Sequence, residues 1–234
     1  MSTFVTRRAA FGIAATAALA SLTACASDIR PLSDPSTPEE QRSYKGELKF
    51  NSYESRGTYV PATSSKKAEN PPKPIPPAKM RAKTTEGMYA AIGFWVASFN
   101  YLILSGDIEP FKAVDINRND IYKAEAFSKL YKSNTGWMYG ADAPVSANLT
   151  EDAPEQVNEH QYRWMATSRY HKKTTIHYTD GRELPMTSLD GNTGDYDFFF
   201  ALKYQDGAWT VWNERVKLAP ISPTSSASSS GASV

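Results

Sequence analysis

The side chain with the most specific chemistry in this sequence is the thiol of Cys25, the only cysteine among the 234 residues. It closes the stretch Leu22-Thr23-Ala24-Cys25, which follows two basic residues, Arg7 and Arg8, and an apolar run that starts at Phe11. A basic start, a short apolar run and small residues at the cleavage site are the three parts of a secretory signal peptide. A cysteine directly after that site is typical of bacterial lipoproteins, whose thiolate forms a thioether with a diacylglyceryl group. We therefore expect cleavage after residue 24 and lipidation of Cys25.

Two alternatives for this leader stay open. In one, the leader is an ordinary secretory signal and Cys25 follows it by chance; the other concerns the export route, because residues 6–11 resemble a twin-arginine signal. The apolar run is too short to cross a hydrocarbon layer of about 30 Å. We therefore expect attachment to the extracytoplasmic side of the cell membrane through the lipid on Cys25. With that thiol acylated, none remains for a disulfide, a nucleophile or a zinc site, and no cofactor is expected.

The histidines, His160, His171 and His177, are the remaining candidates for metal ligation. On one unbroken strand, His171 and His177 would share a face, but six residues at about 3.3 Å each separate them by roughly 20 Å. That separation is far larger than one ligand sphere. We expect exposed strand histidines and no metal site.

Carboxylates are the candidates for acid and base chemistry, because an apolar pocket raises the pKa of a carboxyl group toward the working pH. Asp195 and Asp197 are spaced to share one strand face, opposite an aromatic stripe, which places both on the solvent side. Asp107 and Asp120 are explained as helix caps. No catalytic residue is therefore predicted.

Aromatic side chains are the candidates for an apolar binding pocket. The residues that we single out are Trp95, Tyr101, Trp164, Phe198 and Trp209. A core and a pocket for an apolar ligand would use the same residue types, since aromatic side chains bury the largest areas. Core packing is the favoured interpretation for most of them, and a pocket lining is the alternative.

The charge balance excludes some classes of partner. The chain has 26 basic and 25 acidic residues, a net charge of +1. Removal of residues 1–24 removes two arginines and no acid, which changes the net charge to −1. A nearly neutral protein is not expected to bind nucleic acid, and two acyl chains hold a protein at a membrane without a basic patch.

Composition divides the chain into four parts. We expect a lipoprotein signal peptide at 1–24, a tether with a Pro-rich stalk at 25–83, one α+β domain at 84–218 and a disordered tail at 219–234. Residues 44–60 are richer in aromatic residues than a linker usually is. This stretch is expected to dock on the domain or on a partner.

Apolar spacing and cap signals predict three helices at the start of the domain. The first begins at Thr84 or Thr85, ends at Ser105-Gly106, and is apolar around most of its surface. Asp107 is expected to cap a short second helix, and a third is expected to begin at residues 119–120.

From residue 137 onward the apolar period changes to two, which predicts strands. The clearest stripe runs from Tyr196 to Tyr204, and Asp206-Gly207 is a hairpin signal before the final strand. Helices followed by antiparallel strands predict an α+β fold with a curved, cone-like sheet wrapped on the first helix.

Several short motifs in this order resemble an actinobacterial lipoprotein family of unknown function. They are Tyr59-Val-Pro-Ala-Thr63, Asn70-Pro-Pro-Lys-Pro74, Thr85-Glu-Gly87, Phe99-Asn-Tyr-Leu102, Ser105-Gly-Asp107 and Asp206-Gly-Ala-Trp-Thr-Val211. The resemblance implies a domain like that of nuclear transport factor 2, a fold that hosts enzymes and binding modules alike. It also implies a cysteine pair after the second helix, where this chain has residues 115–121 without cysteine.

Two functions are consistent with the sequence. The first is a noncatalytic envelope lipoprotein whose domain binds an envelope protein or a small apolar ligand. The second is an enzyme of the isomerase or dehydratase type, with a small apolar substrate inside the cone. An inward carboxylate or histidine at a pocket floor would favour the enzyme, and an interior filled by aromatic side chains would favour the binding domain.

Overall fold

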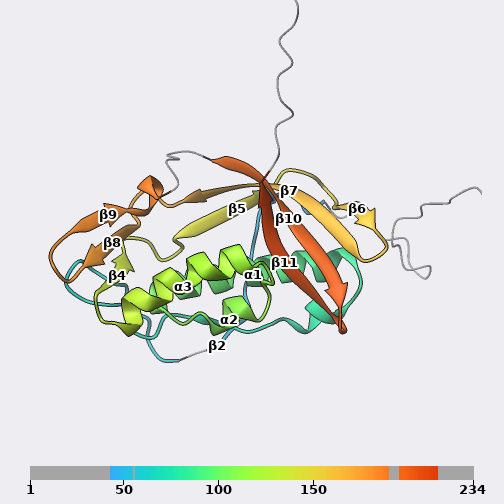
Figure 1. The fold of residues 1–234 in the computed structure, drawn as a ribbon. Helices are drawn as coiled ribbons and strands as arrows, with labels where there is room; N and C mark the ends of the chain where they lie inside the picture. Colours follow the sequence, from blue (N-terminus) through green and yellow to red (C-terminus); the bar gives the residue numbers. More distant parts are fainter. Residues whose placement is uncertain (1–42, 55, 190–194, 216–234) are drawn as a thin grey trace, which may run out of the picture. The chain divides into compact units, whose positions relative to one another are not determined.

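The structure is a computed structural model that describes residues 43–54, 56–189 and 195–215 (Figure 1). The expectations for the leader, for Cys25 and for the tail at 219–234 lie outside the described residues.

The central element is the helix α1 (Thr85–Ser105), and both of its ends are where the sequence predicts them. The Thr84 hydroxyl accepts a hydrogen bond from the backbone N–H of Gly87, which caps the start. Gly106 ends the helix with φ 77°, a left-handed conformation that favours glycine. A Cβ atom at Gly106 would also overlap the ring of Tyr131, so this end of α1 requires glycine twice over.

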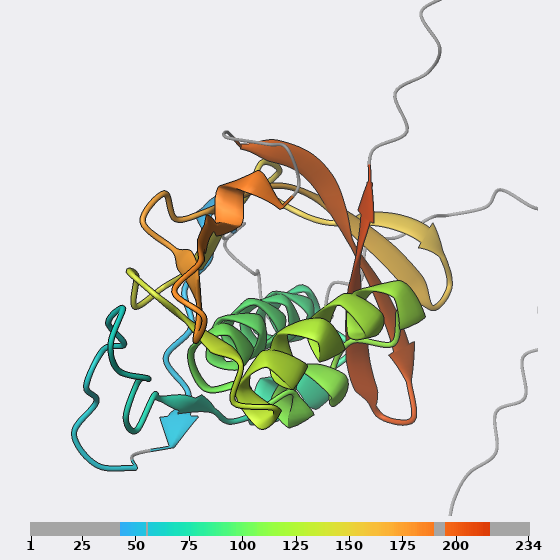
Figure 2. The same ribbon diagram turned by 60° about the vertical axis from the view of Figure 1, so that its left-hand side comes forward.

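Two further helices follow α1 on the same side of the sheet (Figure 2). The short α2 (Glu109–Lys112) starts where Asp107 accepts a hydrogen bond from the Glu109 N–H, as expected of a cap. The longer α3 (Arg118–Lys132) begins slightly earlier than predicted, because the Asn117 side chain caps it by accepting from the Asn119 N–H. The prediction that Asp120 is the cap is wrong, since Asp120 lies inside the first turn.

Every strand pairing in the described residues is antiparallel, and the α+β fold class is confirmed. A six-stranded sheet has the order β1-β5-β7-β10-β11, with β6 paired to the other half of β7. Its strands are β1 (Gly46–Glu47), β5 (Val145–Leu149), β6 (Glu155–Asn158), β7 (Gln161–Tyr170), β10 (Tyr196–Gln205) and β11 (Ala208–Arg215). A three-stranded sheet contains β4 (Gly136–Tyr139), β8 (Thr175–Tyr178) and β9 (Glu183–Pro185), and a two-stranded one contains β2 (Tyr53–Glu54) and β3 (Lys73–Pro74). Two 3-10 turns, η1 (Ala78–Arg81) and η2 (Met186–Ser188), complete the elements.

The β10–β11 hairpin follows the sequence signals closely. Asp206 and Gly207 both have positive φ, as a two-residue hairpin turn requires. The predicted apolar stripe faces α1, with Phe198, Phe200 and Leu202 buried. The alternate residue Asp197 is exposed on the opposite face.

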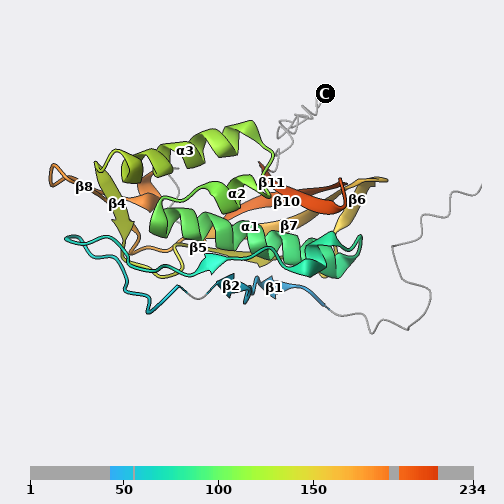
Figure 3. The same ribbon diagram turned by 90° about the horizontal axis from the view of Figure 1, so that it is seen from below.

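Residues 43–83, which the composition assigns to the tether, lie against the domain. Residues 44–50 alternate between half-buried and exposed, and β1 extends the sheet at the edge of β5. Figure 3 shows β1 and β2 along one flank of α1, with α3 along the other. Gly93 permits the close approach of this segment, because a Cβ atom there would lie 3.3 Å from the Phe50 ring. The folded part of the chain therefore begins by residue 43.

Helix α1 is also the one helix among the described residues that is long and apolar enough to cross a membrane. However, 78% of the most apolar 18-residue stretch of α1 is buried inside the domain. A helix that is apolar all round is the core helix of a globular protein when other elements cover it. In this domain the sheet, α3 and the segment 43–54 cover it.

Candidate functional site

Aromatic side chains make up much of the core between α1 and the strands β7, β10 and β11. Of the predicted pocket residues, Trp95, Trp164, Phe198 and Trp209 are each 6% exposed or less and belong to the main core. The ring of Phe200 lies 4.7 Å from that of Phe198 and 5.6 Å from that of Trp95, centroid to centroid. These four predicted residues line neither of the two surface hollows described below.

The indole N–H groups of the core have fixed acceptors. Trp164 donates to the carbonyl of Glu151 at 2.9 Å, and Trp209 donates to the carbonyl of Ala82 at 2.8 Å. Trp95 donates to the carboxylate of Asp115 at 2.6 Å. A buried polar group that already has a partner resists the exchange of that partner for a ligand, so these rings are held in place.

Asp115 is an inward carboxylate that the sequence reasoning did not single out. It is 1% exposed, and its second oxygen accepts a hydrogen bond from the Asn117 N–H at 2.7 Å. Burial raises the pKa of Asp115 to about 7, although the hydrogen bonds from Trp95 and Asn117 oppose that change. The nearby Asp120 raises the pKa further. The group would suit proton transfer, but it lines neither hollow.

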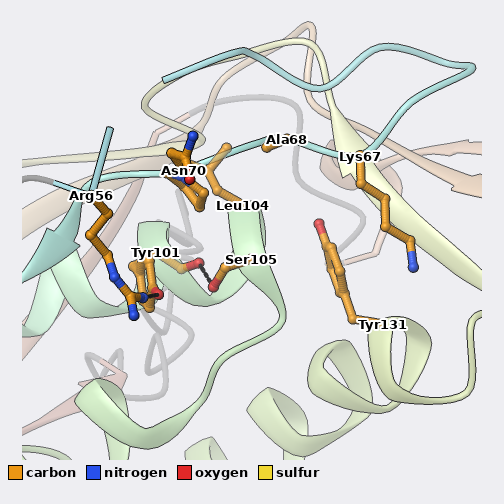
Figure 4. A pocket seen from close by; sticks show the side chains of 9 residues that line it. Arg56, Lys67, Ala68, Asn70, Tyr101, Leu104, Ser105 and Tyr131 are labelled. Carbon is orange, nitrogen blue, oxygen red and sulfur yellow. Dashed lines mark hydrogen bonds between the residues drawn. The ribbon is translucent and has the colours of Figure 1, made fainter. Parts of the chain in front are cut away.

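A pocket of about 240 Å³ lies at the C-terminal end of α1, where the segment 56–71 crosses the ends of α1 and α3. Figure 4 shows Arg56 next to Tyr101 on one side and Lys67 with Tyr131 on the other. The lining of the pocket consists of Arg56, Lys67, Ala68, Asn70, Pro71, Tyr101, Leu104, Ser105 and Tyr131. Tyr101 is thus the one predicted pocket residue that lines a hollow.

The outer wall of this pocket is a loop held to the domain by several hydrogen bonds. Val60 and Glu69 exchange backbone hydrogen bonds at 2.9 and 3.0 Å, which closes the loop as a hairpin. The indole of Trp137 donates to the carbonyl of Thr63 at 2.7 Å. The Tyr59 hydroxyl donates to Asp142 at 3.0 Å, and burial together with this carboxylate raises the pKa of Tyr59. The loop is therefore a fixed part of the pocket.

The pocket is cationic. Arg56 donates from Nη1 to the Tyr101 hydroxyl at 3.2 Å, and Lys67 donates to the amide oxygen of Asn134 at 2.7 Å. The lining has two cations and contains no aspartate or glutamate. The Tyr131 hydroxyl is used structurally, since it donates to the Ile103 carbonyl and accepts from the Met138 N–H, and burial raises its pKa.

A second hollow, of about 1230 Å³, follows the segment 43–53 where that segment crosses α1 and β5. Several polar groups in its walls are paired with each other. Lys49 N–H donates to the Tyr89 hydroxyl at 3.2 Å, and the Asn100 amide exchanges two hydrogen bonds with the backbone of Val145. This hollow is a groove between the segment 43–53 and the surface of α1 and β5, and the charged side chains of Lys79 and Glu86 in its lining form an ion pair.

The predicted acid and metal candidates are not brought together. Asp195 and Asp197 are exposed, as expected, and Asp195 lies 3.5 Å from Arg169. No group of three metal-ligating side chains exists among the described residues. His171 and His177 do not lie on one strand, because β7 ends at Tyr170 and a turn precedes β8. His177 is not fully exposed either: its ring lies 4.4 Å from that of Trp137, and its side chain is 17% exposed.

Fold and pocket together define a small α+β domain with an aromatic core and a cationic surface pocket. A family model described as a family of unknown function (DUF6318) matches residues 57–215, more than half of the chain, so the chain belongs to that family. No curated protein and no solved structure matches the chain. The resemblance to an uncharacterised family is confirmed to this extent, and the relationship to nuclear transport factor 2 stays a prediction.

Proposed function

We propose that the protein is a lipid-anchored lipoprotein of the cell envelope whose domain acts by binding and not by catalysis. The leader that ends at Cys25 supports the anchor. One observation supports binding above all: aromatic side chains are packed in the core between α1 and the strands β7, β10 and β11. In the enzyme alternative, a small apolar substrate would have to occupy that space.

The position of the folded region supports a function close to the membrane. From Cys25 to residue 43 the chain advances 18 positions. A fully extended chain of that length spans at most about 60 Å. If the fold began at residue 84, the corresponding limit would be about 200 Å. The binding surface is therefore proposed to work within tens of ångströms of the bilayer.

Asp115 is the observation that favours the alternative, an isomerase-like or dehydratase-like enzyme. It is the kind of inward carboxylate that general acid and base catalysis uses. Against this function, both of its oxygens accept hydrogen bonds from Trp95 and Asn117, and it is 1% exposed. A substrate would have to displace part of the aromatic core to reach it, so binding is the better supported function.

Metabolic labelling with palmitate tests the anchor. The wild-type protein should carry label and sediment with membranes. Cys25→Ser should lose the label and either release a soluble protein or stall as precursor, because the proposal includes no second anchor. Ser27→Ala, two residues beyond the lipidation site, is the matched control and should behave as wild type. Label and membrane association that survive Cys25→Ser would contradict the anchor.

A further inference from the structure

We propose that the pocket at the C-terminal end of α1 binds a phosphate group through the Arg56 guanidinium and the Tyr101 hydroxyl. This inference rests on the proposed function, since it names the ligand class of a domain that acts by binding.

The hydrogen-bond donors of Arg56 and Tyr101 are only partly used. Among the hydrogen bonds of the described residues, the Tyr101 hydroxyl accepts from Arg56 but donates to none. Arg56 has five N–H donors in a planar fork, and one is bonded to Tyr101. Such a fork binds the oxygens of a phosphate in two parallel hydrogen bonds. The Tyr101 hydroxyl beside it can donate a third hydrogen bond.

The positive charge of the lining is not neutralised within the pocket. The carboxylate near Arg56 is that of Glu54, at 3.9 Å, and both side chains are about half exposed, so their attraction is weak. Lys67 is bonded to a neutral amide, and its ammonium lies 5.9 Å from the centre of the Tyr131 ring. Two cations suit a phosphate monoester, which carries about −1.5 to −2 charges at neutral pH, better than a single carboxylate.

The helix end does not account for these cations. Carbonyls at a helix C-terminus attract positive side chains, because they lack partners within the helix. Two of the last four carbonyls already have donors here: Leu102 accepts from the Gly106 N–H, and Ile103 accepts from the Tyr131 hydroxyl. Among the described hydrogen bonds, neither cation donates to a carbonyl of this helix end: Arg56 donates to the Tyr101 hydroxyl and Lys67 to the Asn134 amide oxygen.

The size of the pocket limits what it can hold. Its volume of about 240 Å³ lies just below the roughly 300–1,000 Å³ typical of sites that enclose a drug-sized ligand. It fits a phosphate group, while the remainder of a larger molecule stays outside. A lipid headgroup and a soluble phosphate ester share this chemistry.

Calorimetric titration of the full chain in detergent with inorganic phosphate tests the site, near pH 7.5 and at constant ionic strength so that screening does not change. Wild type should bind saturably. Arg56→Gln should weaken binding by at least about tenfold, and Tyr101→Phe by about threefold. Arg163→Gln is the matched control, because the Arg163 side chain is 41% exposed, against 46% for Arg56. It should change the affinity by less than about twofold.

Two further titrations identify the source of the phosphate. Glycerol 3-phosphate presents a monoester, and glycerophosphoglycerol presents the diester headgroup of an anionic lipid. Tighter binding of either one supports the site. A preference for glycerol 3-phosphate points to a soluble phosphate ester, and a preference for glycerophosphoglycerol points to a lipid headgroup. The site is overturned if wild type binds none of the three phosphates, if Arg56→Gln and Arg163→Gln lose affinity equally, or if acetate binds as tightly as phosphate.

One more probe separates this inference from the proposed function. Release of nitrophenolate from p-nitrophenyl phosphate by wild type, but not by Arg56→Gln, would retain the anion site and contradict a noncatalytic domain. Palmitate on Cys25 without any phosphate binding would retain the anchor and overturn the pocket.

Discussion

The substitution Asp115→Asn should remove a defined part of the pH dependence of stability. Burial raises the pKa of Asp115 from 3.8 to about 7. The folded state therefore binds a proton that the unfolded state releases between these values, and stability falls as the pH rises through this range. The contribution is fully present below the unfolded pKa and is lost once the pH passes about 7. Between about pH 5 and pH 8, the loss from this group is about 2.5 kcal/mol.

Denaturant unfolding of the wild type and Asp115→Asn at several pH values measures this difference. The asparagine oxygen can still accept from Trp95 or Asn117, so a constant offset of about 1 kcal/mol is expected. The readout is the slope: the wild type should lose about 2.5 kcal/mol more than the variant between those pH values. Asp197→Asn, on the exposed face of β10, is the control and should run parallel to the wild type. If Asp115→Asn also runs parallel, the carboxylate is charged when buried and the reasoning is refuted.

The remaining predictions concern the limits and the interior of the domain. Limited proteolysis should leave a fragment that retains Tyr44, because residues 43–83 pack on α1; a stable core without Tyr44 would show that this segment is a tether. Phe198→Ala should lower the free energy of unfolding by about 3–5 kcal/mol, as measured in denaturant, and Asp197→Asn by less than about 0.5 kcal/mol; equal costs would mean that the faces of β10 are reversed. Trp164→Ala should create a dry cavity that binds benzene in a thermal-shift assay, and wild type should bind none; benzene binding by wild type would reveal an interior pocket.

The helices and the final hairpin were predictable because their signals are local. The Thr84 cap and Gly106 at the end of α1 are set by hydrogen bonds within one turn. The stripe of β10 belongs to the core or packs against it from Tyr196 to Tyr204, which explains its clear period of two. The segment 44–50 carries the same signal, with Tyr44, Leu48 and Phe50 alternating with charged residues. Composition assigns residues 25–83 to the tether, while the aromatic residues at 44–60 predict docking on the domain or on a partner.

The candidate site was less predictable, because it depends on contacts between distant parts of the chain. Arg56 and Tyr101 are 45 positions apart, and no periodic pattern relates a loop residue to a helix end. Burial of Asp115 depends on how the loop after α2 packs against Trp95, 20 positions earlier. A lone aspartate before a helix is more typical of a cap, so the sequence does not indicate that Asp115 is buried in the core.

The central claim, a binding domain held at a membrane by Cys25, is tested most directly by mass spectrometry of the protein extracted from membranes. Because Pro31 blocks tryptic cleavage after Arg30, cleavage after Arg42 should give an N-terminal peptide that begins at Cys25 and carries the mass of a diacylglyceryl group on its thiol. A mature protein that begins at another residue, or a membrane-bound peptide with unmodified Cys25, would contradict the claim.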